Sequence, residues 1–248
     1  MTADRETDVG KAGLGAAMAR LLLEAGAVQV SHDRSFMLAS GWASPVYVDC
    51  RRLLGMPHRR ARATDLALDY LRLRFGEAPP FDAVAGGETA GIPWASWIAD
   101  RFGLPLLYVR KRPLGFGRSA QVEGGAPEGS RVLLVDDLAT DAASKVAFAK
   151  GLRTAGMTLS DALVLFHNRA FPGWGGRLEH LGLSLHALAS WDDVLRLEAD
   201  DALLSPADRE IIERFLRDPA GWSADHGGRR APMEPPPQGT MQTDRKPL

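Results

Sequence analysis

The chain alternates short apolar runs with longer amphipathic stretches. Between residues 59 and 75, apolar side chains recur at spacings of three and four, which predicts an amphipathic helix. A second helix is expected from about Leu14 to Glu24. The order Ser205-Pro206-Ala207-Asp208 predicts the start of a last helix, with serine as the N-cap and proline at the first helical position.

Short apolar segments separate the helical stretches. They are residues 82–85, 105–110, 131–135, 162–167 and 183–189. Short strands that alternate with helices are typical of βαβ units, in which a mostly parallel sheet is buried on both faces. The pattern therefore predicts an α/β fold with a parallel sheet flanked by helices.

The two ends of the chain lack this pattern. Residues 1–12 are polar, and residues 223–248 are rich in proline and glycine with few large apolar side chains. Such composition is typical of disordered segments. We expect one domain over residues 13–222 between a disordered N-terminus and a disordered tail.

Composition and charge narrow the function classes. The 30 Lys and Arg residues balance 31 Asp and Glu residues, so the chain lacks the basic excess of a non-specific nucleic-acid binder. Cys50 is the single cysteine and is expected to be a small buried hydrophobe. No apolar run approaches the length of a membrane helix or signal peptide. A cytoplasmic protein with no nucleic-acid or membrane partner is the expectation.

Candidate chemistry follows the predicted strands, because ligands of open parallel sheets bind beyond the carboxyl ends of the strands. Residues 86–93 form a turn of small residues, and residues 110–118 carry four cations among glycines. Residues 136–144 lead from a buried strand into a helix. Gly86 and Gly87 alone are weak evidence, because they also fit a simple tight bend.

The segment after the third run is the most specific. Asp136 and Asp137 would repel one another, and their burial would cost free energy of hydration. Binding of a ligand's hydroxyl groups or of a metal ion would offset this cost. Thr140 and Ser144 flank a turn into a helix, where backbone N–H groups favour a phosphate. The alternative is that the two aspartates only cap the following helix.

The motif at residues 134–140, with Ser144 downstream, resembles the phosphoribosyl-pyrophosphate (PRPP) motif of type I phosphoribosyltransferases. Five further segments extend this to a resemblance to orotate phosphoribosyltransferases over residues 14–222. They are residues 36–41, Ser44-Pro45, residues 86–93, Arg110-Lys111 and residues 122–124. The resemblance implies a Rossmann-like sheet with a small N-terminal hood at about residues 28–55. It also implies a homodimer, Mg²⁺, and conversion of orotate and PRPP to orotidine 5′-monophosphate and pyrophosphate in pyrimidine synthesis.

The resemblance also implies roles for single residues. Asp136 and Asp137 would hold the ribose hydroxyls, while Glu88 and Thr89 would also contact PRPP. The 5′-phosphate would be bound by the turn made of Thr140, Asp141, Ala142, Ala143 and Ser144. Orotate would be bound by Thr140, Phe36 and Arg169, with the guanidinium on its carboxylate. His167 fits a packing residue better than a base.

The pyrophosphate side of the site is implied in the same way. Arg110, Lys111 and Arg118 would neutralise pyrophosphate from a mobile loop, residues 110–118, that reaches the neighbouring subunit's site. Mg²⁺ would be bound mainly through PRPP itself. The catalytic set is then Asp136, Asp137, Arg110 and Lys111.

The chain also departs from the family pattern. Leu114 stands where the family carries a loop lysine, and Arg112 or Arg118 is a candidate to replace that charge. Ala142 and Ala143 stand where the family has glycines, and alanine tolerates a positive φ poorly. A second hypothesis therefore stays open: a protein of this fold that binds PRPP or a nucleotide in a regulatory role, with little or no turnover.

Overall fold

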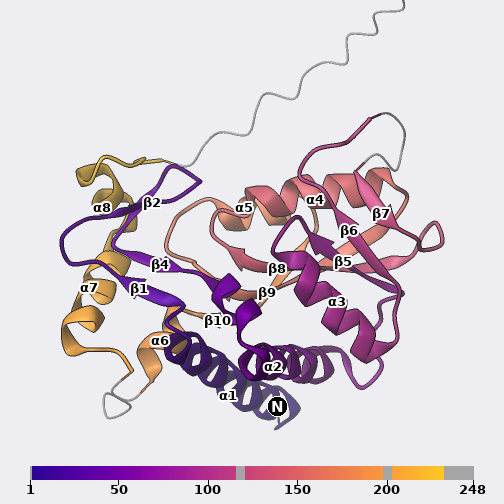
Figure 1. Cartoon of the computed structure of the whole chain (residues 1–248), viewed down its shortest axis with the longest axis horizontal. Helices are drawn as coiled ribbons and strands as arrows, with labels where there is room; N and C mark the ends of the chain where they lie inside the picture. The colour runs from indigo at the N-terminus through magenta and orange to yellow at the C-terminus, as the bar shows by residue number, and fades with distance from the viewer. Residues whose placement is uncertain (1, 116–120, 198–202, 232–248) are drawn as a thin grey trace, which may run out of the picture.

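The computed structural model describes residues 2–115, 121–197 and 203–231. These residues form a central six-stranded sheet in the order β10-β9-β8-β5-β6-β7 (Figure 1). Its strands are β5 (Ala83–Gly87), β6 (Leu106–Val109), β7 (Val122–Gly124), β8 (Arg131–Ala139), β9 (Thr158–His167) and β10 (Ser184–Ser190). Neighbouring strands are parallel except for the pair β6 and β7. The predicted parallel sheet is confirmed, and β7 adds an antiparallel edge.

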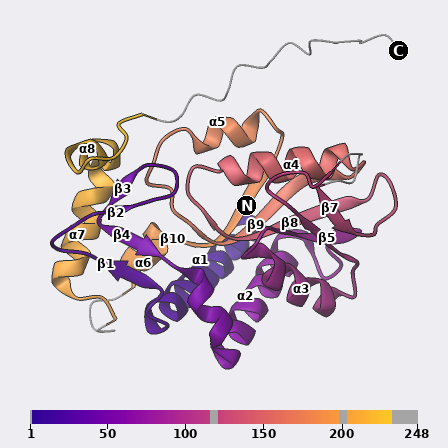
Figure 2. The same cartoon turned by 45° about the horizontal axis from the view of Figure 1, so that its top comes forward.

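Helices cover both faces of the sheet (Figures 1 and 2). One face carries α1 (Thr2–Glu24), α2 (Pro57–Phe75) and α3 (Gly91–Phe102), and the other carries α4 (Ala143–Thr154) and α5 (Trp174–Glu179). Alternation along β8 explains this arrangement, since Leu133 and Val135 pack toward α1–α3 while Leu134 packs toward α4. Among the described helices, none has the length and apolar character needed to cross a bilayer.

Small antiparallel strand pairs lie beside the main sheet (Figure 2). Strand β1 (Val28–Val30) pairs with β4 (Val46–Val48), and β2 (Phe36–Met37) pairs with β3 (Ala43–Ser44). A 3₁₀ helix, η1 (Cys50–Gly55), leads from these strands back to α2. The C-terminal part adds α6 (Trp191–Arg196), α7 (Pro206–Arg217) and α8 (Pro219–Asp225). Residues 28–55 thus form a small unit in the place expected for a hood.

In the described residues, helices extend into both segments that the sequence predicts to be disordered. Helix α1 begins at Thr2 rather than near Leu14, because extending a helix whose other half is packed requires no new nucleus. At the other end, the buried hydroxyl of Ser223 accepts the backbone N–H of Ala43 at 3.0 Å. The backbone N–H of Arg229 donates to the carbonyl of Gly41 at 3.0 Å. These bonds tie the start of the predicted tail to the hood, and residues 232–248 lie outside the described residues.

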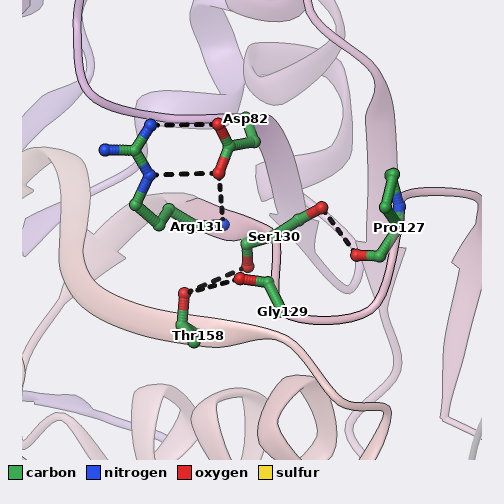
Figure 3. Close-up of polar contacts among 6 residues, drawn as sticks. All are labelled: Asp82, Pro127, Gly129, Ser130, Arg131 and Thr158. Carbon is green, nitrogen blue, oxygen red and sulfur yellow. Dashed lines mark hydrogen bonds and ion pairs between the residues drawn. The ribbon is translucent and has the colours of Figure 1, made fainter.

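An exposed ion pair links Asp82, the residue before β5, to Arg131, the first residue of β8 (Figure 3). The guanidinium of Arg131 lies 3.0 and 3.1 Å from the two carboxylate oxygens of Asp82, which also accepts the Arg131 backbone N–H at 2.8 Å. These hydrogen bonds lower the pKa of Asp82 to about 2. The pair fixes the register of β8 at the end opposite to Asp136 and Asp137.

Candidate active site

The two consecutive aspartates lie within the carboxyl-terminal part of β8. Asp136 is 7% exposed, and its Oδ1 accepts the backbone N–H of Asp137 at 3.0 Å. Burial and the neighbouring charge of Asp136 raise the pKa of Asp137 to about 6. The N–H of Ala143 at the start of α4 is bound by Asp141, at 3.2 Å. The structure therefore gives the aspartates no capping contact and leaves them as a candidate ligand-binding pair.

Lys145 is a site residue that sequence reasoning missed. It is 1% exposed, and its Nζ lies 2.7 Å from Oδ2 of Asp136. It also donates to the carbonyl of Leu138 and lies 3.3 Å from the hydroxyl of Ser144. A lysine in the first turn of a helix opposes the helix dipole, so its position was a signal that an anion had to lie nearby.

The turn from Thr140 to Ser144 brings together the residues predicted to bind a phosphate. Its backbone N–H groups stand at the start of the twelve-residue helix α4. The carboxylate of Asp141 is bound by Arg177 of α5 at 2.9 Å, and Arg177 also donates to the Asp141 carbonyl at 3.0 Å. Asp141 therefore stabilises the turn through its contacts with Arg177. Arg177 is a second residue that the sequence did not reveal.

Ala142 carries the backbone strain expected from the missing glycines, with φ 60° and ψ 10°, whereas Ala143 is helical. The left-handed conformation costs an L-residue roughly 1–2 kcal/mol, and losing the buried methyl group costs about 0.8 kcal/mol. We therefore expect Ala142→Gly to raise the free energy of unfolding by up to about 1 kcal/mol in urea denaturation. The matched control is Ala149→Gly, buried within the same helix, which should lower it by about 1–2 kcal/mol. Lower stability at both positions would contradict the assignment of strain to Ala142.

The hood contributes an aromatic and cationic cluster. Phe36 packs against Tyr47 with ring centroids 5.7 Å apart, and the Tyr47 hydroxyl accepts from Arg51 at 2.9 Å. Arg51 is also held by Asp49 at 2.6 Å, a contact that raises the pKa of the guanidinium, with a smaller contribution from Asp137. Helix η1 also contacts β8, the strand that carries the acidic pair. Sequence reasoning found Phe36 in this cluster and missed Arg51.

Cys50 begins η1 and is fully buried, as predicted. Burial raises the pKa of its thiol well above the usual value, and the charges of Asp137, Asp49 and Asp136 add to the effect. The thiol is therefore protonated at neutral pH and fits a packing role beside the site.

The structure does not bring Arg110 to the acidic pair of its own chain. Arg110 follows β6 and donates to Glu123 and to the Tyr108 hydroxyl, both at 2.9 Å. Strand β5 separates β6 from β8, which amounts to about 10 Å between strand axes.

Other predicted site residues lie near Arg110, beyond the carboxyl ends of β5 and β6. Glu88 and Thr89 follow β5, and Glu88 accepts the backbone N–H of Lys111 at 2.7 Å. Leu114 is 65% exposed, and Arg118 lies outside the described residues.

Arg169 and His167 lie at the carboxyl end of β9, the strand that neighbours β8. Arg169 is exposed in the turn after the strand. His167 is 1% exposed and packs edge-on against Trp174, with ring centroids 4.4 Å apart. Burial, helped by the charges of Arg169 and Lys145, lowers the pKa of His167 to about 4. The imidazole is therefore neutral and a weak base, which agrees with a packing role.

Comparison with known proteins decides the family. No family model matches the chain. The orotate phosphoribosyltransferase of Rhizobium meliloti (strain 1021) is 43% identical over 221 residues, which cover 89% of this chain and 95% of that protein. The chain belongs to the orotate phosphoribosyltransferase family. The resemblance seen in its motifs is thereby confirmed. The family is one of glycosyltransferases of pyrimidine biosynthesis, so the non-catalytic alternative is not favoured.

Solved structures confirm the type I phosphoribosyltransferase fold. Orotate phosphoribosyltransferase from Aeropyrum pernix is 37% identical with a TM-score of 0.59, over 72% of this chain and 96% of that one. UMP synthase of Leishmania donovani is 28% identical with a TM-score of 0.66, over 82% of this chain and 42% of that one. In this phosphoribosyltransferase, the acidic pair lies in the Rossmann-like sheet.

The described part of this phosphoribosyltransferase shows no group of three or more His, Cys, Asp and Glu side chains placed to hold a metal ion. One carboxylate oxygen of its acidic pair is engaged by Lys145 at 2.7 Å. Mg²⁺ usually keeps several waters and is commonly bound through substrate phosphate oxygens. The site therefore suits a Mg²⁺ ion bound through the phosphate oxygens of the substrate, and no side chain among the described residues is assigned to it as a ligand.

Proposed function

We propose that this site transfers the 5-phosphoribosyl group of PRPP to orotate. A bond forms between a ring nitrogen of orotate and C1′ of the ribose, while the bond from C1′ to the pyrophosphate oxygen breaks and the ring nitrogen gives up its proton to pyrophosphate or solvent. The products are orotidine 5′-monophosphate and pyrophosphate. One observation carries the proposal: an acidic pair in β8, with Asp136 buried and Asp137 half-buried, stands two residues before the turn that presents backbone N–H groups at the start of α4.

The chemistry suits these groups. Departure of pyrophosphate builds positive charge on the ribose, and carboxylates placed beside it stabilise that charge. Asp136 and Asp137 would hold the ribose hydroxyls in this position. The turn from Thr140 to Ser144 would hold the 5′-phosphate against the amino end of α4. Glu88 and Thr89, which follow the neighbouring strand β5, would contact PRPP from the other side.

The leaving group needs cations. Mg²⁺, when bound through the PRPP oxygens, supplies charge neutralisation for pyrophosphate. Arg110 and Lys111, with Arg118, would add to it from a loop at residues 110–118 that reaches the site of a second copy in a homodimer. The distance of β6 from β8 within one chain supports such an exchange. The enzyme would act in the cytoplasm.

A steady-state assay tests the proposed function. Orotate absorbance should fall only when PRPP and Mg²⁺ are both present, with one pyrophosphate released for each orotate consumed. Uracil, which lacks the carboxylate, should be a poor substrate. Binding of PRPP without loss of orotate would favour the regulatory hypothesis, and absence of both would reject the proposal.

We expect Arg169→Ala to raise the KM for orotate by about 10-fold or more, with little change in the KM for PRPP. The guanidinium is expected to hold the orotate carboxylate through a charge-assisted contact, which PRPP does not use. Separate saturation curves for the two substrates measure the effect. Arg217→Ala, an exposed arginine in the last turn of α7, is the matched control. Equal weakening of both substrates would place Arg169 outside the base pocket.

A further inference from the structure

A buried ammonium group stands behind the acidic pair. The side chain of Lys145 is 2% exposed and reaches back from α4 to Oδ2 of Asp136, at 2.7 Å. Its remaining partners are the Leu138 carbonyl and the Ser144 hydroxyl. Apolar side chains often fill such a core position with equal or greater stability than a buried ion pair. The charge therefore calls for an explanation other than stability.

The contacts fix Asp136 in one orientation. Lys145 holds Oδ2, and the backbone N–H of Asp137 holds Oδ1 at 3.0 Å, so the carboxylate cannot rotate without losing a bond. The lysine also offsets the negative charge that Asp136 places beside Asp137. Burial and Asp136 raise the pKa of Asp137, and the charge of Lys145 lowers it.

We propose that Lys145 is a positioning residue for ribosyl transfer, which fixes the Asp136 carboxylate and offsets its charge so that Asp137 can face the ribose in its ionised form. This inference rests on the proposed function, which places the ribose of PRPP on these two aspartates. Other groups also act on the Asp137 carboxyl or lie close to it. They are the Leu138 backbone N–H in β8 and the side chains of Cys50 and Arg51 in η1. Asp49, the N-cap of η1, is bound to Arg51.

A double-mutant cycle tests whether Lys145 acts through Asp136. The variants are Lys145→Met, Asp136→Asn and the two combined, with Lys150→Met as the control because Lys150 is exposed on the same helix. We expect Lys145→Met to lower kcat/KM for PRPP by about 10²-fold, with the KM for orotate changed by less than about threefold. Lys150→Met should stay within about twofold of wild type. The combined variant should stay within about threefold of Asp136→Asn, because a residue that acts through Asp136 has no further effect once that carboxylate is gone.

The pH profile separates positioning from a purely structural role. In Lys145→Met the acid limb of kcat/KM for PRPP should move to higher pH, because Asp137 loses the positive charge that favours its ionised form. A purely structural lysine would lower thermal stability and leave the limb in place. If Lys145→Met does not fold, the comparison of Asp136→Asn with the combined variant decides, because the combined variant leaves no unpaired carboxylate at position 136.

A failure of this inference can be distinguished from a failure of the proposed function. A Lys145→Met enzyme within about threefold of wild type, with an unchanged acid limb, would overturn the inference. A loss in the combined variant that equals the product of the single losses would overturn it as well. If the wild type does not consume orotate, the proposed function fails, and a ¹³C NMR titration of the aspartate carboxyls then tests Lys145. An Asp137 carboxyl that titrates at higher pH in Lys145→Met supports the inference, and an unchanged titration rejects it.

Discussion

Asp137→Asn should cost activity and increase stability at the same time. The carboxylate would serve the charge that develops on the ribose, so we expect kcat/KM to fall by about 10²-fold or more. The folded protein raises the pKa of Asp137 to about 6, chiefly by burial and then by the charge of Asp136. A carboxyl whose pKa is raised by folding opposes folding when it is ionised. The amide removes that penalty, which is about 2–3 kcal/mol at about pH 8.

The stability gain of Asp137→Asn should depend on pH. The stability gain of Asp137→Asn over wild type should be full above the folded pKa of about 6. It should shrink as the pH falls, and vanish below the ordinary aspartate pKa of 3.8, where the wild-type carboxyl is protonated in both states. Urea denaturation at several pH values measures it. Asp192→Asn, at an exposed position of α6, is the control and should change neither activity nor stability. Lower stability together with full activity would mean that Asp137 is a structural residue.

Much of the fold could be predicted from the sequence, because its main signals are local. The run from Val132 to Val135 shows a strand buried on both faces, and Ser205 accepts the N–H of Asp208 at 3.0 Å, as its N-cap position predicted. Strand β8 nevertheless extends to Ala139, through two aspartates that have low strand propensity. Pairing with β9, in which Ala139 lies opposite His167, maintains the strand there. Strand β7 was missed because three residues give too short a pattern.

The candidate site was readable only where its residues are contiguous in sequence. Asp136, Asp137 and the turn from Thr140 to Ser144 form one segment, and a family motif marks them. Arg177 is 36 positions from Asp141, and Arg51 belongs to η1, which contacts β8, so both arrangements depend on tertiary packing. Nothing in a single sequence specifies such pairs. For Arg110 the sequence motif was recognised, but its contact with Glu123 could not be predicted.

Gly91→Ala should damage folding and activity together, because helix α3 begins directly against the acidic pair. A Cβ at position 91 would overlap the Val135 carbonyl and lie 3.0 Å from the Cα of Asp136 and 3.1 Å from its Oδ1. Backbone atoms of a central strand cannot move aside as a flexible side chain does. We expect the free energy of unfolding to fall by about 2–4 kcal/mol. Displacement of Asp136 should lower kcat/KM for PRPP by about 10-fold or more, since misplacement of about 1 Å is costly in catalysis.

Gly175→Ala provides the matched control, because a Cβ there meets nothing within 4 Å and the residue also lies in a helix, α5. That substitution should be neutral or slightly stabilising, since alanine favours helix over glycine by about 1 kcal/mol. Urea denaturation and PRPP saturation curves on both variants measure the contrast. If Gly91→Ala loses stability but keeps wild-type kcat/KM, α3 yields to the added methyl group, and the position of Asp136 does not depend on it. If it keeps both, the close approach of α3 to β8 is not a constraint on the site.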